Sequence, residues 1–206
     1  MGTSEFWYYK DITLHYHLEG EGPPFFLVHG YSSALDWRVW ELAIPLLTTE
    51  HTVYALDMVG HGKSTKVDPK PSNEKQANYI VEMIQEKGFS NCSLAGVSWG
   101  ALICQLVASK IPELVKRLVL ISSAGYRLTD DILETTRDIP TLIIWSEDDN
   151  IIPLAKGKEL AHKLPQAKFV VIPALPGVSG EAAHHPQRNK ASLTNPHIRA
   201  FLKETQ

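Results

Sequence analysis

The stretch Gly96-Val97-Ser98-Trp99-Gly100 lies where an apolar run of strand length, Asn91–Val97, is followed by a segment of helical length, Ser98–Lys110. A sharp turn from strand to helix leaves no space for side chains beside its central residue, so glycine is needed on both sides of Ser98. Such a turn exposes the serine hydroxyl, and the N–H of the next residue lies at the helix N-terminus, where negative charge is stabilised. The pattern therefore predicts a nucleophilic serine at position 98, with the N–H of Trp99 as an oxyanion donor.

Outward from this stretch, apolar runs of strand length alternate with segments of helical length. Runs such as Phe25–Val28 and Thr141–Trp145 are continuously apolar, as expected for parallel strands covered on both faces. The alternation predicts an α/β fold with a mostly parallel central sheet flanked by helices. The expected strands are Asp11–His17, Pro24–His29, His51–Asp57, Asn91–Val97, Val115–Ser122, Thr141–Ser146 and Ala167–Pro173, and the expected helices are Trp37–Leu47, Asn73–Lys87, Ser98–Lys110, Leu154–Leu164 and Thr194–Lys203.

Composition limits the classes of protein to consider. The chain has 206 residues, of which 44% are hydrophobic and 21% charged, as in ordinary globular proteins, and this length is expected to form one domain over residues 1–206. A formal net charge of −3 offers no basic surface to a phosphate backbone, which argues against nucleic acid as a partner. No apolar run approaches the ~18 residues that a membrane span needs. Nothing in the composition indicates an oligomeric state.

The cysteines and the first residues bear on localisation. Cys92 and Cys104 lie in apolar contexts without the spacing of a metal site, which predicts reduced, buried thiols, no zinc, and a cytoplasmic or other reducing compartment. Residues 1–6, Met-Gly-Thr-Ser-Glu-Phe, lack the features of a signal peptide and resemble a cloning remnant, so a targeting peptide could have been removed.

Two loops resemble those of the α/β-hydrolase superfamily. His29-Gly30-Tyr31 follows an expected strand and is similar to the family's H-G-x turn, which implies that the N–H of Tyr31 is the second oxyanion donor and that His29 is structural. The segment from Asp57 to Ser64 reads Asp-Met-Val-Gly-His-Gly-Lys-Ser and looks like the family's D-x-x-G-H-G-x-S turn. The resemblance implies that Asp57 and His61 shape the floor of the site and are not catalytic.

A serine nucleophile needs a histidine that takes its proton and a carboxylate that orients the histidine. The resemblance implies the chain order serine, acid, histidine. The segment Ser146–Pro153 is similar to the family's G-x-x-D-x-x-x-P pattern, with Ser146 in the place of the usual glycine. By that register Asp149 is the acid, and its neighbour Asp148 is expected to be solvated.

The base is expected in the long segment after the strand Ala167–Pro173. The family commonly carries H-x-P there and an Asn-Pro that opens the last helix, and His184-His185-Pro186 and Asn195-Pro196 match both. The resemblance implies His184 as the base, with His185 as the alternative. The other histidines have no assigned role: His197 is expected at the surface, and those expected far from the carboxyl-end loops are His15, His17, His51 and His162.

Many members of the superfamily insert a helical cap before the strand that precedes the acid. Here the corresponding interval, Ala124–Pro140, has room for only one short helix, Asp130–Thr136. The resemblance thus implies a small member whose cap is absent or minimal, with an open site walled by Tyr31 and Trp99. A Trp99 side chain that packs the start of the helix instead is the alternative.

These observations predict a carboxylesterase-like serine hydrolase that cleaves a small-molecule acyl ester through an acyl-enzyme on Ser98, with Asp149 and His184 completing the triad and Tyr31 and Trp99 forming the oxyanion hole. They imply no metal and no organic cofactor. A thioesterase, an amidase, a perhydrolase or a C–C hydrolase would use the same residues. A hydrolase-fold binding or interaction protein without turnover is the alternative from another class.

Overall fold

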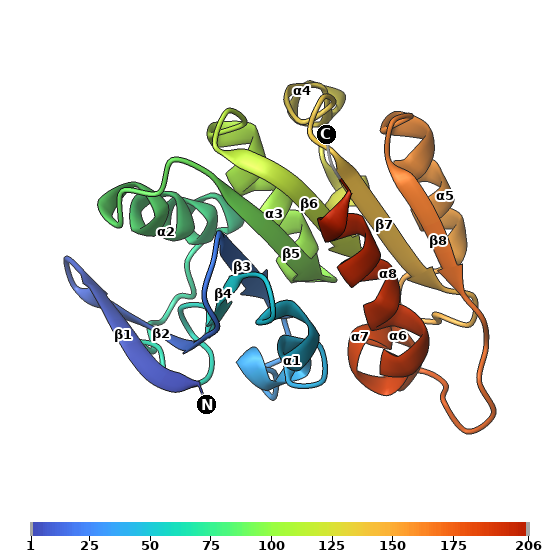
Figure 1. The fold of residues 1–206 in the computed structure, drawn as a ribbon, viewed down its shortest axis with the longest axis horizontal. Coiled ribbons are helices and arrows are strands. Elements are labelled where there is room, and N and C mark those ends of the chain that lie inside the picture. Colours follow the sequence, from blue (N-terminus) through green and yellow to red (C-terminus); the bar gives the residue numbers. More distant parts are fainter. Residues whose placement is uncertain (1, 205–206) are drawn as a thin grey trace.

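The computed structural model describes residues 2–204, which contain an eight-stranded sheet of order β1-β2-β4-β3-β5-β6-β7-β8 (Figure 1). Neighbouring strands are parallel along the part of the sheet β4-β3-β5-β6-β7-β8. Strand β2 pairs with β4 and with β1 in antiparallel fashion. Their bounds are β1 Thr3–Tyr9, β2 Ile12–Glu19, β3 Pro24–Val28, β4 Thr52–Leu56, β5 Cys92–Val97, β6 Val115–Ile121, β7 Thr141–Ser146 and β8 Lys168–Ile172.

Helices cover both faces of this sheet and form two apolar layers. The 3-10 helices are η1 Trp37–Trp40 and η2 Ala124–Arg127, and the α-helices are α1 Ile44–Leu47, α2 Asn73–Glu86, α3 Trp99–Lys110, α4 Asp130–Thr135, α5 Leu154–Lys163, α6 Glu181–His184, α7 Pro186–Asn189 and α8 Ala191–Lys203. Buried residues of α2, α3 and α5 pack on one face, and those of α1 and α8 pack on the other. The strands serve both layers because successive side chains alternate: Phe26 belongs to the first layer and Phe25 to the second.

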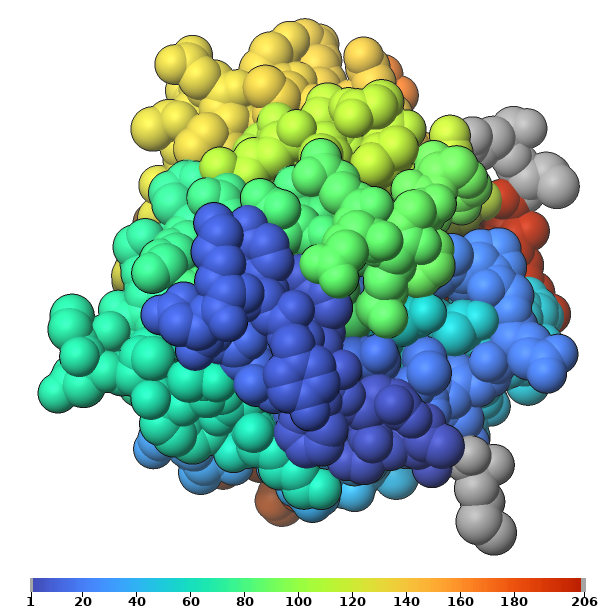
Figure 2. All heavy atoms as spheres, turned by 90° about the vertical axis from the view of Figure 1, so that its left-hand side faces the viewer, coloured from blue at the N-terminus to red at the C-terminus, as the bar shows by residue number. Residues whose placement is uncertain are grey.

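The predicted α/β fold with a mostly parallel sheet is confirmed, and each expected strand is present. Strand β1 was missed, because its first residues were interpreted as a cloning remnant. Among residues 2–204 it pairs with β2 alone, as an edge strand, and Tyr8 is 71% exposed, so it lacks the continuous apolar pattern of the central strands. Figure 2 shows this hairpin spread across one side of the molecule beside α2, where Tyr9 meets Tyr79 with ring centroids 6.5 Å apart.

The expected helix Trp37–Leu47 is wrong as a single element. The segment forms the 3-10 helix η1 and the four-residue helix α1. Pro45 lies in the first turn of α1, and a proline cannot donate the backbone hydrogen bond that would continue a helix through that position.

The last helix also begins earlier than expected. Asn195-Pro196 lies inside α8 and does not open it, because the carbonyl of Lys190 already accepts hydrogen bonds from the N–H groups of Leu193 and Thr194. The short helices α6 and α7, which the sequence did not predict, precede it.

Between β6 and β7 the chain forms only η2 and α4. The prediction that a cap domain is absent or minimal is therefore confirmed for this interval. Within residues 2–204, no helix is long and apolar enough to cross a membrane.

Candidate active site

Ser98 occupies a strained turn between β5 and α3. Its backbone has φ 57° and ψ −119°, a conformation that non-glycine residues rarely adopt and that concentrates at functional sites. A Cβ on Gly96 would clash with the backbone of Gly100, and a Cβ on Gly100 would clash with the carbonyls of Val28 and His29. Both glycines are therefore sterically required, as the sequence predicted.

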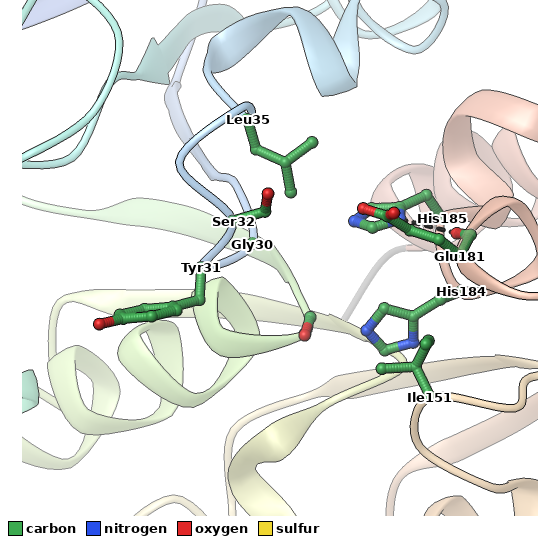
Figure 3. A pocket seen from close by; sticks show the side chains of 9 residues that line it. Gly30, Tyr31, Ser32, Leu35, Ile151, Glu181, His184 and His185 are labelled. Atoms are coloured by element: carbon green, nitrogen blue, oxygen red, sulfur yellow. Dashed lines mark hydrogen bonds between the residues drawn. The ribbon is translucent and has the colours of Figure 1, made fainter.

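The half-buried Ser98 lines an open cavity of about 320 Å³ at the carboxyl ends of the strands. Figure 3 shows Tyr31, Ser32 and Leu35 on one side of this cavity, with His184, His185 and Glu181 opposite. The cavity is open, as expected without a cap: Tyr31 is 57% and Ile151 56% exposed. The lining residues are Gly30, Tyr31, Ser32, Leu35, Ser98, Ile151, Glu181, His184 and His185.

Two of the predicted site residues form a buried pair. The Nδ1 atom of His184 lies 2.8 Å from Oδ2 of Asp149, whose Oδ1 accepts hydrogen bonds from the N–H groups of Ile151 at 3.0 Å and Ile152 at 2.9 Å. The pair fixes the imidazole with its proton on Nδ1. The buried Nε2 of His184 has no hydrogen-bond partner in the described part of the chain, although the residue lines the cavity. It is thus placed to accept a proton there.

The carboxyl group of Asp149 is held in its ionised form. Burial acts to raise its pKa, but the hydrogen bond and the charge of His184 and the N–H of Ile152 act against burial. The net result is a pKa below the ordinary value of an aspartate.

His185, the alternative base, has different partners. Its Nδ1 lies 3.0 Å from the carbonyl oxygen of Glu181, and burial lowers the pKa of its ring. The rings of His184 and His185 meet edge to face with centroids 5.1 Å apart. Both histidines reach the cavity, but Asp149 bonds to His184.

The loop around Tyr31 is held by two histidines. The fully buried His29 donates from Nδ1 to the carbonyl of Gly30 at 2.6 Å and accepts at Nε2 from the N–H of Met58 at 3.0 Å. Burial lowers the pKa of His29 to about 4, so its ring is neutral at neutral pH. His61 donates from Nε2 to the carbonyl of Tyr31 at 2.9 Å. Neither ring lines the cavity, which agrees with the structural roles expected for both.

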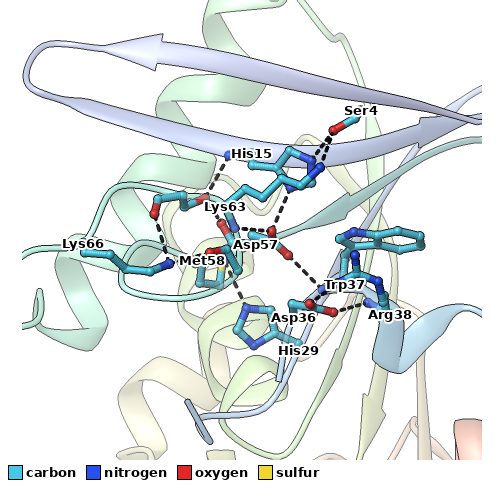
Figure 4. A network of polar contacts seen from close by, with 12 residues as sticks. Ser4, His15, His29, Asp36, Trp37, Arg38, Asp57, Met58, Lys63 and Lys66 are labelled. Atoms are coloured by element: carbon cyan, nitrogen blue, oxygen red, sulfur yellow. Dashed lines mark hydrogen bonds and ion pairs between the residues drawn. The ribbon is translucent and has the colours of Figure 1, made fainter. Parts of the chain in front are cut away.

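Asp57 organises the turn after β4 (Figure 4). Its carboxylate accepts from the N–H of Lys63 at 2.8 Å and of Trp37 at 2.9 Å, and a Cβ on Gly62 would clash with it. It also bonds to Nδ1 of His15 at 2.7 Å. The expectation that His15 lies far from these loops is therefore wrong, because antiparallel pairing places β2 beside the end of β4.

The Trp99 side chain packs the start of α3 and does not line the cavity. It is buried, and its indole N–H donates to Oδ1 of Asn73 at 2.8 Å. The ring of Tyr31 meets it edge on, with centroids 5.5 Å apart. Tyr31 forms a wall of the cavity, as the sequence suggested. Trp99 does not, and its side chain packs the start of the helix, which was the alternative.

Asp148 is not solvated as expected. It is half-buried and pairs with Nζ of Lys190, a side chain with 0% exposure whose ammonium also donates to the carbonyl of Pro173 at 2.9 Å. A buried ammonium needs an opposite charge, and Asp148 provides it. This pair could not be predicted from the sequence, because lysines are rarely buried.

Cys92 and Cys104 are free and buried, and burial raises the pKa of the Cys92 thiol to about 12. Between residues 2 and 204, no cluster of three or more His, Cys, Asp or Glu side chains is suited to a metal ion. The cysteines therefore have no role at the cavity.

A family model described as alpha/beta hydrolase fold matches residues 23–137, which contain the Tyr31 loop, the Asp57 turn and the Ser98 turn. The chain belongs to the alpha/beta hydrolase fold family. Asp149 and His184 lie beyond the matched residues, so their assignment depends on the geometry described above.

Two relatives of this chain are named as hydrolases, and another is named as the acetyltransferase component of an acetoin cleaving system. Over 56% of the chain it is 33% identical to (E)-2-((N-methylformamido)methylene)succinate hydrolase of Acinetobacter baylyi, and over 55% it is 32% identical to 2-hydroxymuconate semialdehyde hydrolase of a Pseudomonas species. The aligned parts cover 43% and 41% of those proteins, so the chain spans less than half of their length. The structure of E-2-(acetamidomethylene)succinate hydrolase superposes with a TM-score of 0.83 over 99% of this chain and 100% of that chain, at 19% identity, which shows a shared fold.

Proposed function

We propose that this alpha/beta hydrolase is a serine hydrolase that cleaves a carboxylic ester through an acyl-enzyme formed on Ser98. The observation that carries the proposal is the buried pair of Asp149 and His184, whose second imidazole nitrogen lies in the wall of the cavity that Ser98 lines. A serine in a strained turn and a histidine oriented by a carboxylate are the parts that nucleophilic acyl transfer requires.

In the first half of the reaction, Nε2 of His184 takes the proton of the Ser98 hydroxyl while Oγ attacks the ester carbonyl. Asp149 stabilises the imidazolium that forms, since its carboxylate accepts the hydrogen bond from Nδ1. The tetrahedral intermediate then collapses, and His184 gives the proton to the departing alkoxide. In the second half, water attacks the acyl-enzyme, His184 takes the water's proton and returns it to Ser98, and the carboxylic acid leaves.

Two backbone N–H groups are the proposed oxyanion donors. Trp99 is the first residue of α3, where backbone N–H groups have no partner within the helix. The N–H of Tyr31 has no acceptor among residues 2–204, and Tyr31 lines the cavity with Ser98. Each such donor typically contributes ~3 kcal/mol to stabilisation of the transition state.

An ester demands less of this site than an amide or a C–C bond, because an alkoxide leaves more readily than an amide nitrogen or a carbanion. Short-chain p-nitrophenyl esters test the proposal. We expect the wild type to hydrolyse them and Ser98→Ala to lose at least ~1,000-fold in kcat. Equal rates for both proteins would contradict the proposal.

A C–C hydrolase is the second candidate, favoured by the name of the relative that acts on 2-hydroxymuconate semialdehyde. It would use the same Ser98, Asp149 and His184. Cleavage of that compound at a higher kcat/KM than any p-nitrophenyl ester would replace the ester assignment by this one.

A further inference from the structure

We propose that His185 makes the cavity selective for esters that carry a hydrogen-bond donor, a hydroxyl or an N–H, a few bonds from the reacting carbonyl. The inference rests on the proposed function, because it concerns the substrate of the same cavity. His185 would be a specificity-determining residue, and the proton transfers remain with His184.

The proton on the ring of His185 is placed by its partner. Nδ1 lies 3.0 Å from the carbonyl oxygen of Glu181, and a carbonyl can only accept, so Nδ1 carries the hydrogen. A neutral imidazole with its hydrogen on Nδ1 has a lone pair on Nε2. Burial lowers the pKa of His185, which keeps the ring neutral at neutral pH. Nε2 is therefore an acceptor and not a donor.

This acceptor lies close to the nucleophile. The point at which a Cβ on Gly30 would stand is 3.5 Å from Nε2 of His185 and 3.6 Å from Cβ of Ser98. Because residue 30 is a glycine, no side-chain atom of its own fills this point of the cavity wall, and a group placed there requires Cδ1 of Leu35, 3.0 Å away, to shift by a few tenths of an ångström. A group bonded near the reacting carbon of an acyl chain on Ser98 is thus within reach of Nε2.

Nε2 of His185 is also without a partner. The ring is more than nine-tenths buried, and no atom of residues 2–204 bonds to this nitrogen. A substrate without a donor leaves this buried nitrogen unpaired, whereas a hydroxyl or N–H that reaches it gives it a partner. Sites with such an unpaired polar group discriminate strongly against analogues that lack the matching group.

The carboxylate of Glu181, on this side of the cavity, agrees with a donor on the substrate. Glu181 is exposed beside His185 (Figure 3), and an ionised carboxylate only accepts hydrogen bonds. Glu181 also repels anions, so a substrate carboxylate on this side is disfavoured. A neutral hydroxy ester or amido ester fits both groups.

Two pairs of esters, whose members differ only in methylation of the donor hydroxyl, test the inference and show on which side of the ester the donor belongs. Ethyl 3-hydroxybutyrate and ethyl 3-methoxybutyrate place it on the acyl side, and 2-hydroxyethyl butyrate and 2-methoxyethyl butyrate place it on the alcohol side. We expect the wild type to prefer the hydroxy member of one pair by tenfold or more in kcat/KM. A ratio near one in both pairs would overturn the inference.

The variants assign the preference to His185. His185→Phe removes the acceptor and is expected to bring the hydroxy-to-methoxy ratio to about one, while His185→Gln, whose amide oxygen can accept, is expected to restore part of it. An undiminished ratio in His185→Phe would overturn the inference. If that variant does not fold, a wild-type ratio near one in both pairs still overturns the inference, and the lowered ratio expected for His185→Gln still tests the role of His185.

Ethyl butyrate separates the two proposals. If the wild type hydrolyses it in a Ser98-dependent way but shows no preference within either pair, only the inference about His185 fails. If no ester in the set is hydrolysed, the proposed function fails and the inference about His185 with it.

Discussion

His184 and Asp149 meet through a hydrogen bond of 2.8 Å between Nδ1 and Oδ2, although one follows β8 and the other follows β7. The parallel arrangement of these two neighbouring strands brings their carboxyl ends to the same edge of the sheet, which is where Ser98 also lies at the end of β5. The bond distinguishes His184 from the adjacent His185, and four consequences of the geometry can be measured.

The two histidines are expected to respond differently to the same substitution. His184→Gln removes the proposed base and should lower kcat for a p-nitrophenyl ester by at least ~1,000-fold. His185→Gln leaves the pair of Asp149 and His184 in place, so its loss of kcat on this substrate, which has no donor, should be less than ~10-fold. Steady-state kinetics on both variants decide the matter, and the reverse order would make His185 the base.

The carboxylate of Asp149 is expected to act through the imidazole. Asp149→Asn can present an NH₂ group to Nδ1 of His184, which favours the wrong tautomer, and kcat should fall by roughly 10⁴-fold. The exposed neighbour Glu147 offers a matched control, since Glu147→Gln makes the same chemical change outside the cavity. If both variants keep wild-type kcat, Asp149 is not the acid.

Asp148→Ala should affect stability and not chemistry. It leaves the ammonium of the fully buried Lys190 with the carbonyl of Pro173 alone, and removing one partner of a buried pair costs about 3 kcal/mol. Urea denaturation measures the free energy of unfolding. As a control, Glu134→Ala breaks the exposed pair with Arg137 and should cost less than ~1 kcal/mol. Equal losses in the two variants would contradict the structural role of Lys190.

Acid should destabilise the protein partly through His29. Its pKa falls from 6.5 to about 4 because the ring is buried, so the unfolded chain binds more protons at this residue between those pH values. The stability is complete above pH 6.5 and decreases as the pH falls toward 4, by about 3 kcal/mol in total. Burial also lowers the pKa of His61 and His185, so the relevant quantity is the difference from His29→Gln. Identical pH profiles of unfolding free energy for the two proteins would contradict this assignment.

The central strands and the Ser98 turn between β5 and α3 could be predicted because each depends on the residue types within a short stretch of sequence. Two glycines flank Ser98 for steric reasons, and a strand covered on both faces must be apolar at every position. Strand β1 and the bond between His15 and Asp57 depend instead on pairing between distant segments. The antiparallel pairing of β2 with β4, which a single sequence does not reveal, is what brings His15 to the Asp57 turn.

The sequence alone was least able to decide whether His184 or His185 is the base. His184 is the last residue of α6, and His185 follows it with the non-helical angles φ −118° and ψ 63°, so the two side chains leave the backbone in different directions. Which one faces Asp149 depends on how α6 follows the loop after β8, and that loop has no pattern from which its path could be derived. The resemblance to a family favoured His184, and the structure pairs His184 with Asp149.

The central claim is that the hydroxyl of Ser98 is made reactive by His184. The most direct measurement is treatment of the folded protein with a fluorophosphonate, followed by mass spectrometry of its peptides. A single adduct is predicted on the peptide that contains Ser98, absent from Ser98→Ala and strongly reduced in His184→Gln. A folded wild-type protein that stays unlabelled, or that is labelled on another residue, would contradict the claim.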